Sequence, residues 1–479
     1  MDIDVSKYFK PNLNEARKRS RKDVSHDQFY LDEQLKTIGH GKKYLIDTYG
    51  CQANEADGET MAGILTLMGF EKTSQELEAD IIIINTCAIR ENAENRVWGE
   101  LGRLKALKRE NPDLILGVSG CMAQEENVVN RILKKFQHVD LVFGTHNIDQ
   151  LPQYIQTAMF SKERVIEVFS QEGHIVENLP KTRNHSKKAW VNIMFGCDEF
   201  CTYCIVPYTR GKERSRLKED VIQELIELKQ LGYLEVTLLG QNVNAYGKDF
   251  KDNDYTFGDL LRDIDTIGIP RIRFTTSHPH DLDLKTMEAI RDCDTIMPFF
   301  HLPVQSGSSS VLKKMNRHYT KESYLEKLEQ LRTIVPGISV TTDIIVGFPG
   351  ETDDDFLDTL DLVEKAKFEG AFTFVYSPRE GTPAAKFEDK LDPQIKKERL
   401  YKLNESINQG YLEGNQRFLN QVVEVLVDGP SKNNPEVLAG YSPHQKLINF
   451  KASDELVGTI VKVRITEVKT WFMIGELVS

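Results

Sequence analysis

The sequence contains no run of about 18 apolar residues, the length that a helix needs to cross a membrane. Residues 1–23, MDIDVSKYFKPNLNEARKRSRKD, also lack the apolar core of a secretory signal. These two absences argue against a membrane protein or a secreted protein. We therefore expect a cytoplasmic protein.

Cysteine is scarce as well, with seven in 479 residues. In a reducing compartment such cysteines are not expected to form structural disulfides, and clustered ones are typical of metal binding or redox chemistry. There is no excess of basic residues either. The net charge of -12 argues against a protein that coats nucleic acid, but it leaves room for a local basic patch.

The composition, 40% hydrophobic and 28% charged, is that of a soluble globular protein long enough for about three domains. Apolar strand patterns alternate with helical patterns over most of the chain, which predicts a mixed α/β fold. We expect a flexible or partly helical extension, an N-terminal parallel-sheet domain, a polar linker, a central partial (β/α)6 barrel and a small C-terminal β-barrel. Their predicted bounds are residues 1–40, 41–175, 176–188, 189–415 and 416–479.

Three cysteines of the N-terminal domain each follow an apolar strand candidate. YLIDTYGC ends at Cys51, DIIIINTC ends at Cys87 and LILGVSGC ends at Cys121. The carboxyl ends of parallel strands lie on one edge of an open sheet, which is where such sheets bind ligands. We therefore expect the three thiols to converge. The alternative is three separate buried thiols that pack as small hydrophobic side chains.

The central region contains six strand candidates separated mostly by helical patterns, which predicts a curled parallel sheet with its active edge at the strand carboxyl ends. In the helix expected after the fifth strand, Thr352 is the N-cap, acidic residues 353–355 favour the positive end of the dipole, and Phe356, Leu360 and Val363 share one face. The six candidates are residues 189–196, 234–240, 271–277, 296–304, 338–347 and 371–377.

FGCDEFCTYC, residues 195–204, places Cys197, Cys201 and Cys204 directly after the first of these strands. Zinc prefers four ligands in two close pairs, and C-x3-C-x2-C has no second pair nearby. A four-iron cluster takes one thiolate per iron, so three cysteines would leave one iron open. That iron could bind a small molecule through an amine and a carboxylate, both of which S-adenosylmethionine offers.

CDEFCTYC resembles the signature of radical S-adenosylmethionine enzymes. The chain is similar to the methylthiotransferases of that superfamily over residues 43–479, and CTYCIVPYTRGKERSR and QNVNAYG favour the branch that acts on N6-dimethylallyladenosine in tRNA. The branches that act on threonylcarbamoyladenosine in tRNA or on a ribosomal protein are the alternatives. The other similar motifs are TYGCQANEAD, INTCAIRENAE, GVSGCMAQ, HLPVQSGSS, MNRHYT and TTDIIVGFPGET.

The resemblance implies a tRNA methylthiotransferase with two 4Fe-4S clusters and S-adenosylmethionine. Cys197, Cys201 and Cys204 would hold the first cluster, and Cys51, Cys87 and Cys121 the second. In this family one S-adenosylmethionine methylates sulfur at the second cluster, and another is cleaved to a radical that removes the hydrogen from carbon 2 of the modified adenine at position 37. No side chain could break that carbon–hydrogen bond by acid–base chemistry, so no catalytic residue is expected beyond the cluster ligands.

The partners that follow are the tRNA anticodon stem-loop, an electron donor such as flavodoxin or ferredoxin, and a sulfur-supplying system. We expect a monomer with no membrane contact. The alternative that abandons catalysis is an iron–sulfur or zinc RNA-binding protein that senses redox state.

Cofactor contacts are expected from polar residues at the strand ends, although such residues can also satisfy only the loop backbone. The resemblance adds an aromatic residue near the cofactor adenine and the glycine-rich GFPGE turn. The predicted S-adenosylmethionine contacts are Tyr203, Gln241, Asn242, Gln305, Ser306, Arg317, Asp343, Gly347, Phe348, Pro349, Gly350 and Glu351.

Basic residues follow the cysteine cluster in YTRGKERSR. They form either a solvated charge run or an anion site for the cofactor carboxylate or RNA phosphates. These residues are Arg210, Lys212, Arg214 and Arg216.

The last 60 or so residues predict about five short strands and a small closed barrel, which resembles the TRAM domain of RNA-modifying enzymes. It would bind RNA or serve only as a structural cap. Its candidate phosphate contacts are Lys446, Asn449, Lys451, Lys462 and Arg464.

Three residues that could be mistaken for ligands are excluded. His278 and His280 in TSHPHD are expected to be hydrogen-bonded loop residues. Cys293 has no thiol partner nearby in the sequence and is expected to be structural.

Overall fold

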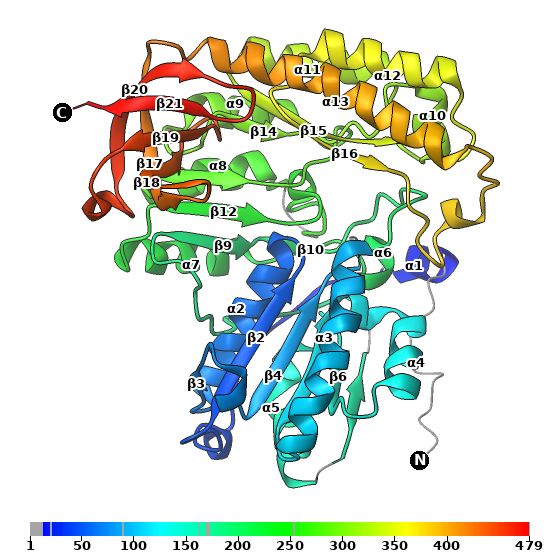
Figure 1. The fold of residues 1–479 in the computed structure, drawn as a ribbon, viewed down its shortest axis with the longest axis vertical. Helices are drawn as coiled ribbons and strands as arrows, with labels where there is room; N and C mark the ends of the chain where they lie inside the picture. The colour runs from blue at the N-terminus through cyan, green and yellow to red at the C-terminus, as the bar shows by residue number, and fades with distance from the viewer. Residues whose placement is uncertain are drawn as a thin grey trace.

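The computed structural model describes residues 13–19, 22–88, 91–161, 163–168, 173–251 and 254–478. The central domain lies above the N-terminal domain in Figure 1, and the small barrel lies against the left end of the central domain. Within the described ranges, every helix is too short or too polar to span a bilayer. The predicted class, a parallel-sheet domain followed by a partial barrel and a small closed barrel, is confirmed.

The N-terminal domain is a parallel sheet of six strands. Its central strands are buried along their whole length, as parallel strands covered on both faces require. In spatial order the strands are β3 (Glu71–Lys72), β2 (Lys43–Tyr49), β4 (Ile81–Thr86), β5 (Ile115–Gly120), β6 (Leu141–Phe143) and β7 (Val165–Glu167).

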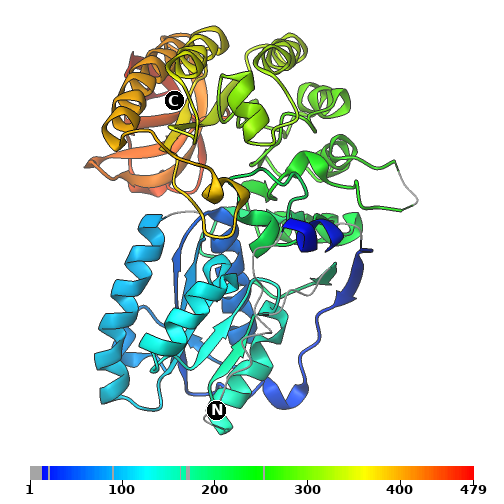
Figure 2. The ribbon, with the colours of Figure 1, turned by 90° about the vertical axis from the view of Figure 1, so that its right-hand side faces the viewer.

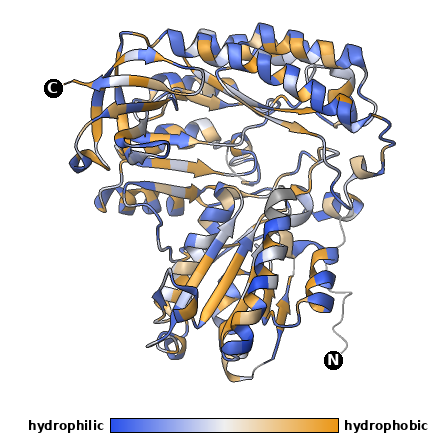
Figure 3. Ribbon diagram, viewed as in Figure 1, coloured by the Kyte–Doolittle hydropathy of each residue, from blue (hydrophilic) through white to orange (hydrophobic). Residues whose placement is uncertain are grey.

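Helices cover both faces of this sheet (Figure 2). Helices α2 (Gln52–Leu67) and α5 (Leu151–Phe160) pack on one face, and α3 (Glu91–Glu110) and α4 (Glu126–Lys135) pack on the other. Figure 3 shows the apolar strand β4 between helices with polar outer faces. The chain adds β3 on one side of β2 and β4 on the other, so the strand order reverses at β2, where open α/β sheets bind ligands.

The central domain consists of two three-stranded parallel sheets joined by a bridge between Ile272 and Ile296. All six predicted strands are present, and the first and last form the open edges of a partial barrel. They are β9 (Lys188–Asn192), β12 (Glu235–Leu239), β13 (Arg271–Phe274), β14 (Phe299–His301), β15 (Ser339–Val346) and β16 (Ala371–Val375). The short strands β10 (Met194–Phe195) and β11 (Arg214–Ser215) form a separate antiparallel pair.

Helices surround the outside of the partial barrel (Figure 1). The predicted helix is α12, where the Thr352 hydroxyl accepts a hydrogen bond from the Asp355 amide at 3.1 Å and Phe356 and Val363 are buried. The outer helices are α7 (Lys218–Gln230), α8 (Phe257–Asp265), α9 (Leu284–Asp292), α10 (Ser309–Lys314), α11 (Lys321–Ile334), α12 (Asp353–Ala366) and α13 (Pro393–Gln416). The short helix α6 (Val206–Thr209) instead lies against the N-terminal domain.

The C-terminal strands close into the predicted small barrel, in the order β17-β18-β19-β21-β20. Alternate residues such as Val425, Val427 and Val463 point into its apolar core. The strands are β17 (Val422–Ser431), β18 (Asn434–Tyr441), β19 (Leu447–Lys451), β20 (Ile460–Val468) and β21 (Met473–Leu477).

The segment predicted to be an extension, residues 1–40, is described from residue 13 except for residues 20 and 21. It forms helix α1 (Leu13–Arg19) and strand β1 (Ser25–Gln28), which pairs in parallel with β8 (His174–Glu177). Leu31 and Leu35 then join the core of the N-terminal domain. The predicted domain bounds themselves stay a prediction.

Two buried arginines on β13 attach the C-terminal barrel to the central domain. Arg273 pairs with Glu235 at 2.9 Å and donates to the carbonyl oxygens of Ser442 and Pro443 at 2.7 and 2.9 Å. Arg271 donates to the Tyr441 carbonyl at 2.7 Å. The barrel loop after β18 is therefore fixed by charge-assisted hydrogen bonds.

We expect Arg273→Met to lower the apparent free energy of unfolding by about 3–5 kcal/mol, because it leaves the Glu235 carboxylate buried without this partner. Thermal unfolding of the full-length chain measures the change. Arg262→Met is the matched control, since the exposed Arg262–Asp292 pair contributes little. Equal midpoints for Arg273→Met and the control would contradict the role of Arg273.

Candidate active site

The three clustered cysteines lie in a loop between β10 and α6, at the carboxyl end of the first barrel strand. Gly196 begins the loop with a positive φ of 76°, and a Cβ there would lie 1.9 Å from the Lys212 carbonyl oxygen. Only glycine fits this position. The Cys197 amide donates to the Gly211 carbonyl at 3.1 Å, so the loop starts against the segment that follows it.

Asn316 holds the middle of the cysteine loop. Its side-chain amide donates to the carbonyl oxygens of Glu199 and Phe200 at 3.1 Å each. The Thr202 amide donates to the Met315 carbonyl at 2.9 Å. Sequence reasoning missed Asn316, although it lies in the motif MNRHYT, because the contact spans more than 110 residues.

The three cysteines of the N-terminal domain converge as predicted. Cys51 lies between β2 and α2, Cys87 directly follows β4 and Cys121 directly follows β5. The three strands β2, β4 and β5 are neighbours in one sheet. Cys51 hydrogen-bonds with Cys87. The three thiols are therefore not far from one another, and their role as ligands stays a prediction.

Two asparagines connect these strand ends. The Cys51 thiol donates to Asn54 Oδ1 at 3.3 Å, and Asn54 Nδ2 donates to the Thr86 carbonyl at 3.1 Å. Asn85 Nδ2 donates to the Asn54 carbonyl at 2.6 Å. Both asparagines are fully buried, so the start of α2 is tied to the end of β4.

Arg210 links the two cysteine sites. It projects from the segment after the cysteine loop, donates from Nη2 to Asp57 Oδ2 at 2.6 Å and donates from Nε to Cys121 Sγ at 3.1 Å. All three residues are buried. Sequence reasoning missed Asp57, which lies in the motif TYGCQANEAD, because nothing in the sequence pairs it with a residue 153 positions away.

All six candidate ligand cysteines line one cavity of about 2060 Å³. Its wall includes the carboxyl ends of the N-terminal strands, the inside of the partial barrel, and residues of the C-terminal barrel such as Tyr441 and Trp471. The cysteines are Cys51, Cys87, Cys121, Cys197, Cys201 and Cys204.

Burial raises the pKa of three of these thiols. It raises the pKa of Cys121 to about 11, that of Cys204 to about 12 and that of Cys197 well above its usual value. A hydrogen bond with Cys87 lowers the pKa of Cys51 to about 5. Thiols that burial keeps neutral become thiolates when a metal supplies positive charge, so both groups fit iron ligation.

Six of the predicted cofactor contacts line the cavity. Arg317 donates to Cys201 Sγ at 3.4 Å and to the Pro303 carbonyl at 2.7 Å. Gln305 has a positive φ of 71°, an uncommon conformation for a non-glycine residue, and its amide donates to the Asp343 carbonyl at 2.8 Å. The six are Tyr203, Gln241, Asn242, Gln305, Arg317 and Asp343.

Gln241 and Asn242, like Arg317, also hydrogen-bond protein groups. Gln241 Oε1 accepts a hydrogen bond from the Gly196 amide at 2.5 Å. Asn242 donates to Asp281 at 2.5 Å and accepts from the His278 amide at 3.2 Å. Both residues therefore also position the loops around the cavity.

The remaining predicted contacts do not line the cavity. Ser306 is buried and its hydroxyl accepts from the Ser308 amide at 3.2 Å. Phe348 is buried against Tyr376, and Glu351 accepts from the Gly347 amide at 3.0 Å. The residues that the structure does not bring to the cavity are Ser306, Gly347, Phe348, Pro349, Gly350 and Glu351, and their role stays a prediction.

The basic run after the cysteine loop is buried, so its interpretation as a solvated charge run is wrong. Arg216 pairs with Glu177 and Glu224 at 2.6 Å each. Lys212 donates to the Lys22 carbonyl. Acidic or backbone partners within the protein therefore occupy these side chains.

The candidate phosphate contacts of the C-terminal barrel do not all face the cavity, and their role stays a prediction. Lys446 lines the cavity, but it is buried and pairs with Glu369 at 2.9 Å. Lys451, Lys462 and Arg464 are exposed outside the cavity lining.

His278 and His280 form hydrogen bonds within their loop, as predicted. The His280 amide donates to His278 Nδ1 at 3.3 Å, and its ring lies 3.0 Å from Asp281. The ligand atoms of Glu199, His278, His280 and Asp281 also lie within 4.8 Å of one another. Lys248 already pairs with Asp281, so this group connects the cysteine loop to the loop after β13.

Cys293 is buried in the central core, as expected for a structural residue.

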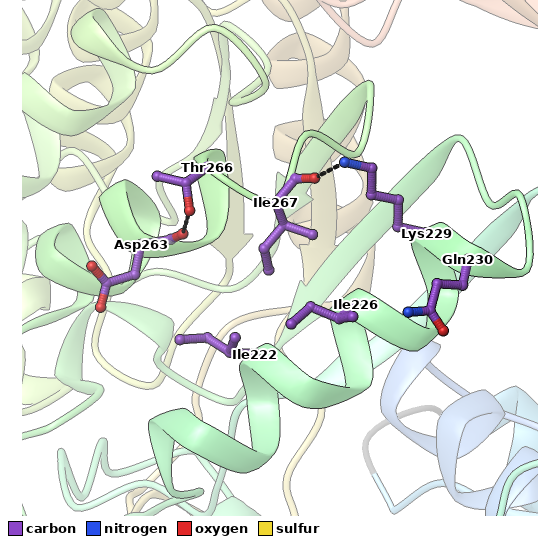
Figure 4. Close-up of a pocket in the computed structure, with 7 residues that line it drawn as sticks. All are labelled: Ile222, Ile226, Lys229, Gln230, Asp263, Thr266 and Ile267. Atoms are coloured by element: carbon purple, nitrogen blue, oxygen red, sulfur yellow. Dashed lines mark hydrogen bonds between the residues drawn. The ribbon is translucent and has the colours of Figure 1, made fainter.

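A second pocket of about 600 Å³ lies on the outside of the central domain, between α7 and the end of α8 (Figure 4). Lys229 donates to the Ile267 carbonyl, and the Thr266 hydroxyl donates to the Asp263 carbonyl at 2.7 Å. Ile222 and Ile226 form its apolar floor. It contains no cysteine and shares no residue with the large cavity.

Three family models match the three domains. The uncharacterized protein family UPF0004 matches residues 43–144, the radical SAM superfamily matches residues 191–363 and the TRAM domain matches residues 416–478. The fold and the cysteine loop thus define a radical S-adenosylmethionine protein. Membership of this superfamily implies a 4Fe-4S cluster and S-adenosylmethionine.

Curated relatives define the family more narrowly. A tRNA-2-methylthio-N(6)-dimethylallyladenosine synthase of Oceanobacillus iheyensis is 58% identical over 99% of this chain and 93% of its own length. One from Bacillus cereus is 57% identical over 99% of this chain and 95% of its own length. The chain belongs to the family of tRNA-2-methylthio-N(6)-dimethylallyladenosine synthases.

A solved structure supports the fold. The radical S-adenosylmethionine methyltransferase TsrM from Kitasatospora setae, solved with a tryptophan substrate and a cofactor analogue, matches with a TM-score of 0.54. The match covers 72% of this chain and 75% of TsrM at 14% identity. At this identity it shows the fold alone.

We expect Arg210→Met to lower the free energy of unfolding by about 3–5 kcal/mol, because Asp57 then loses the cation that pairs with it in the interior. Adding Asp57→Asn should recover part of this loss, since it removes the buried charge. Thermal unfolding of the full-length chain measures both.

Arg103→Met, which removes an exposed ion pair with Glu76, is the matched control for Arg210→Met. Wild-type stability of Arg210→Met, or no recovery in the double variant, would contradict the pairing.

Proposed function

We propose that this chain installs a methylthio group on carbon 2 of N6-dimethylallyladenosine at position 37 of tRNA. The observation that carries the proposal is the single cavity lined by two groups of three cysteines and walled by the TRAM domain. The names of the relatives give the same product. These relatives are named as enzymes for this nucleoside. Their names therefore argue against the two alternatives, a redox-sensing RNA-binding protein and a methylthiotransferase that acts on one of the two other substrates.

Cys197, Cys201 and Cys204 would hold the first cluster and leave one iron for S-adenosylmethionine. When bound, this cluster and S-adenosylmethionine supply a radical that can remove hydrogen from a carbon that acid–base chemistry cannot activate. The protein contributes position: Asn316 holds the loop, and Arg317 donates to Cys201 Sγ. Tyr203, Gln305 and Asp343 line the cavity beside them and would contact the cofactor.

Cys51, Cys87 and Cys121 would hold a second 4Fe-4S cluster, the site at which sulfur is methylated. Their convergence at the strand switch point and the Arg210 hydrogen bond to Cys121 support this assignment. A hydrogen bond to a cluster sulfur ligand stabilises the more negative state. Arg210 would thus tune the second cluster as well as hold the domains together.

The target base must leave the RNA stack to reach the cavity. The TRAM domain contributes Tyr441, His444 and Trp471 to the cavity wall, and the Trp471 ring is 67% exposed. Exposed aromatic rings are suited to stacking on unpaired bases. We propose that the anticodon loop enters between the TRAM domain and the N-terminal domain.

The proposed chemistry needs partners for electrons and sulfur. Reductive cleavage of S-adenosylmethionine consumes one electron, which a flavodoxin or ferredoxin would supply. Each product carries away one sulfur atom, which a sulfur-supplying protein would replace.

Iron analysis after anaerobic reconstitution tests the two clusters. We expect about eight iron and eight sulfide per chain, and about four of each in the Cys51→Ala/Cys87→Ala/Cys121→Ala variant. Cys293→Ala, which removes a buried cysteine outside the cavity, should keep the full content. About four irons in both the wild type and the triple variant, or zinc in their place, would refute the second cluster.

Nucleoside analysis of tRNA tests the reaction. A strain without this protein should lose 2-methylthio-N6-dimethylallyladenosine and accumulate N6-dimethylallyladenosine. The wild-type chain should restore the modification, and Cys201→Ala should not, because it removes a ligand of the first cluster. Loss of a methylthiolated threonylcarbamoyladenosine instead would assign a different substrate.

A further inference from the structure

Two phenylalanines of strand β16 are exposed inside the large cavity. Phe372 is 64% exposed and Phe374 is 49% exposed, and both line the cavity. Strand residues alternate between two faces. Thr373, between them, hydrogen-bonds Asn404 of α13 at 2.6 Å, so the other face packs on the outer helix and the two rings face inward.

The surroundings of the rings identify the kind of ligand. Register pairs Phe372 with Asp343 and Phe374 with Ile345 on the neighbouring strand β15. The edge of the His301 ring meets Phe372, with centroids 6.1 Å apart. The site therefore offers two apolar ring faces, one aliphatic side chain, and the Asp343 carboxylate, whose Oδ1 lies 3.4 Å from His301 Nε2.

A ligand that covers these rings gains apolar burial, and its chemistry is restricted. Aromatic faces suit a flat base with an apolar substituent. The same apolar rings disfavour a substituent that carries its own carboxylate, because covering the rings would take that charge out of water. A dimethylallyl group satisfies both conditions, whereas a threonylcarbamoyl group does not.

We propose that Phe372 and Phe374 form the binding wall for the N6-dimethylallyl-adenine of the RNA and select it over unmodified adenine and over adenine with an acidic N6 substituent. This inference rests on the proposed function. The two residues are specificity-determining contacts and take no part in cluster binding, since neither touches a cysteine in the described contacts.

Binding of three synthetic anticodon stem-loops to the reconstituted full-length protein tests the proposal. They carry N6-dimethylallyladenosine, adenosine or N6-threonylcarbamoyladenosine at position 37 and are otherwise identical. We expect wild type to bind the first RNA most tightly. Phe372→Ala/Phe374→Ala should weaken that binding about tenfold or more and bring the three Kd values together.

A matched control and a conservative variant separate this role from a structural one. Phe160→Ala removes a 69% exposed ring on α5 outside the cavity and should leave all three Kd values unchanged. Phe372→Leu/Phe374→Leu keeps apolar side chains and should retain part of the preference. If the alanine variant fails to load iron, the leucine variant decides the question. Its preference for the N6-dimethylallyladenosine RNA should then be weaker than that of the wild type but still present.

Two outcomes would overturn the inference. One is an unchanged preference in a variant that loads iron normally. The other is an equal loss of S-adenosylmethionine affinity, measured by equilibrium dialysis, which would place the rings in the cofactor site. Failure of the proposed function can be distinguished from failure of this inference. In that case the wild type would form no methylthiolated product from the first RNA under reducing conditions.

Discussion

The geometry of the site depends on one buried cation, Arg210. It leaves the segment after the first cysteine group and contacts both Asp57 on α2 and Cys121 at the end of β5. An unpaired charge at this buried position would cost several kcal/mol, so the partners keep each other in place. One side chain thereby fixes a helix, a strand end and a cysteine loop relative to one another.

A second ionic network supports the same interface from the other side of α2. Arg183 of the segment between β8 and β9 pairs with Glu59 on α2 at 3.0 Å and with Glu224 on α7 at 2.6 Å, and Arg216 joins Glu224. These residues are buried or nearly so, and the pair of Arg183 with Glu59 joins α2 of the N-terminal domain to this network. Chemistry by a radical requires fixed distances between the reacting groups, and this network of buried pairs holds the two cysteine-bearing domains in position.

Much of this arrangement was predictable from local sequence. Apolar strands that end in Cys51, Cys87 and Cys121 predict convergence because parallel strands share an edge, and the clustered cysteines follow a strand in the same way. Arg210 with Asp57, and Asn316 with the cysteine loop, were not predictable because those pairs form only on folding. Lys446 was assigned to RNA by its charge, yet its partner Glu369 comes from another domain. The GFPGE turn stays a predicted ligand segment, and its Phe348 packs inward against Tyr376, a contact that the motif alone does not show.

The size of the cavity bears on how the site operates. Pockets for one small ligand measure roughly 300–1,000 Å³, and this cavity holds about 2060 Å³. One cofactor would leave most of it to water, which would quench a reactive intermediate. A nucleoside, a cofactor and the two cysteine-bound groups together use such a volume. Because the TRAM residues Tyr441 and Trp471 form part of the wall, RNA that lies against them would cover part of the cavity. Binding of the substrate would therefore exclude water at the moment when the reaction needs it excluded.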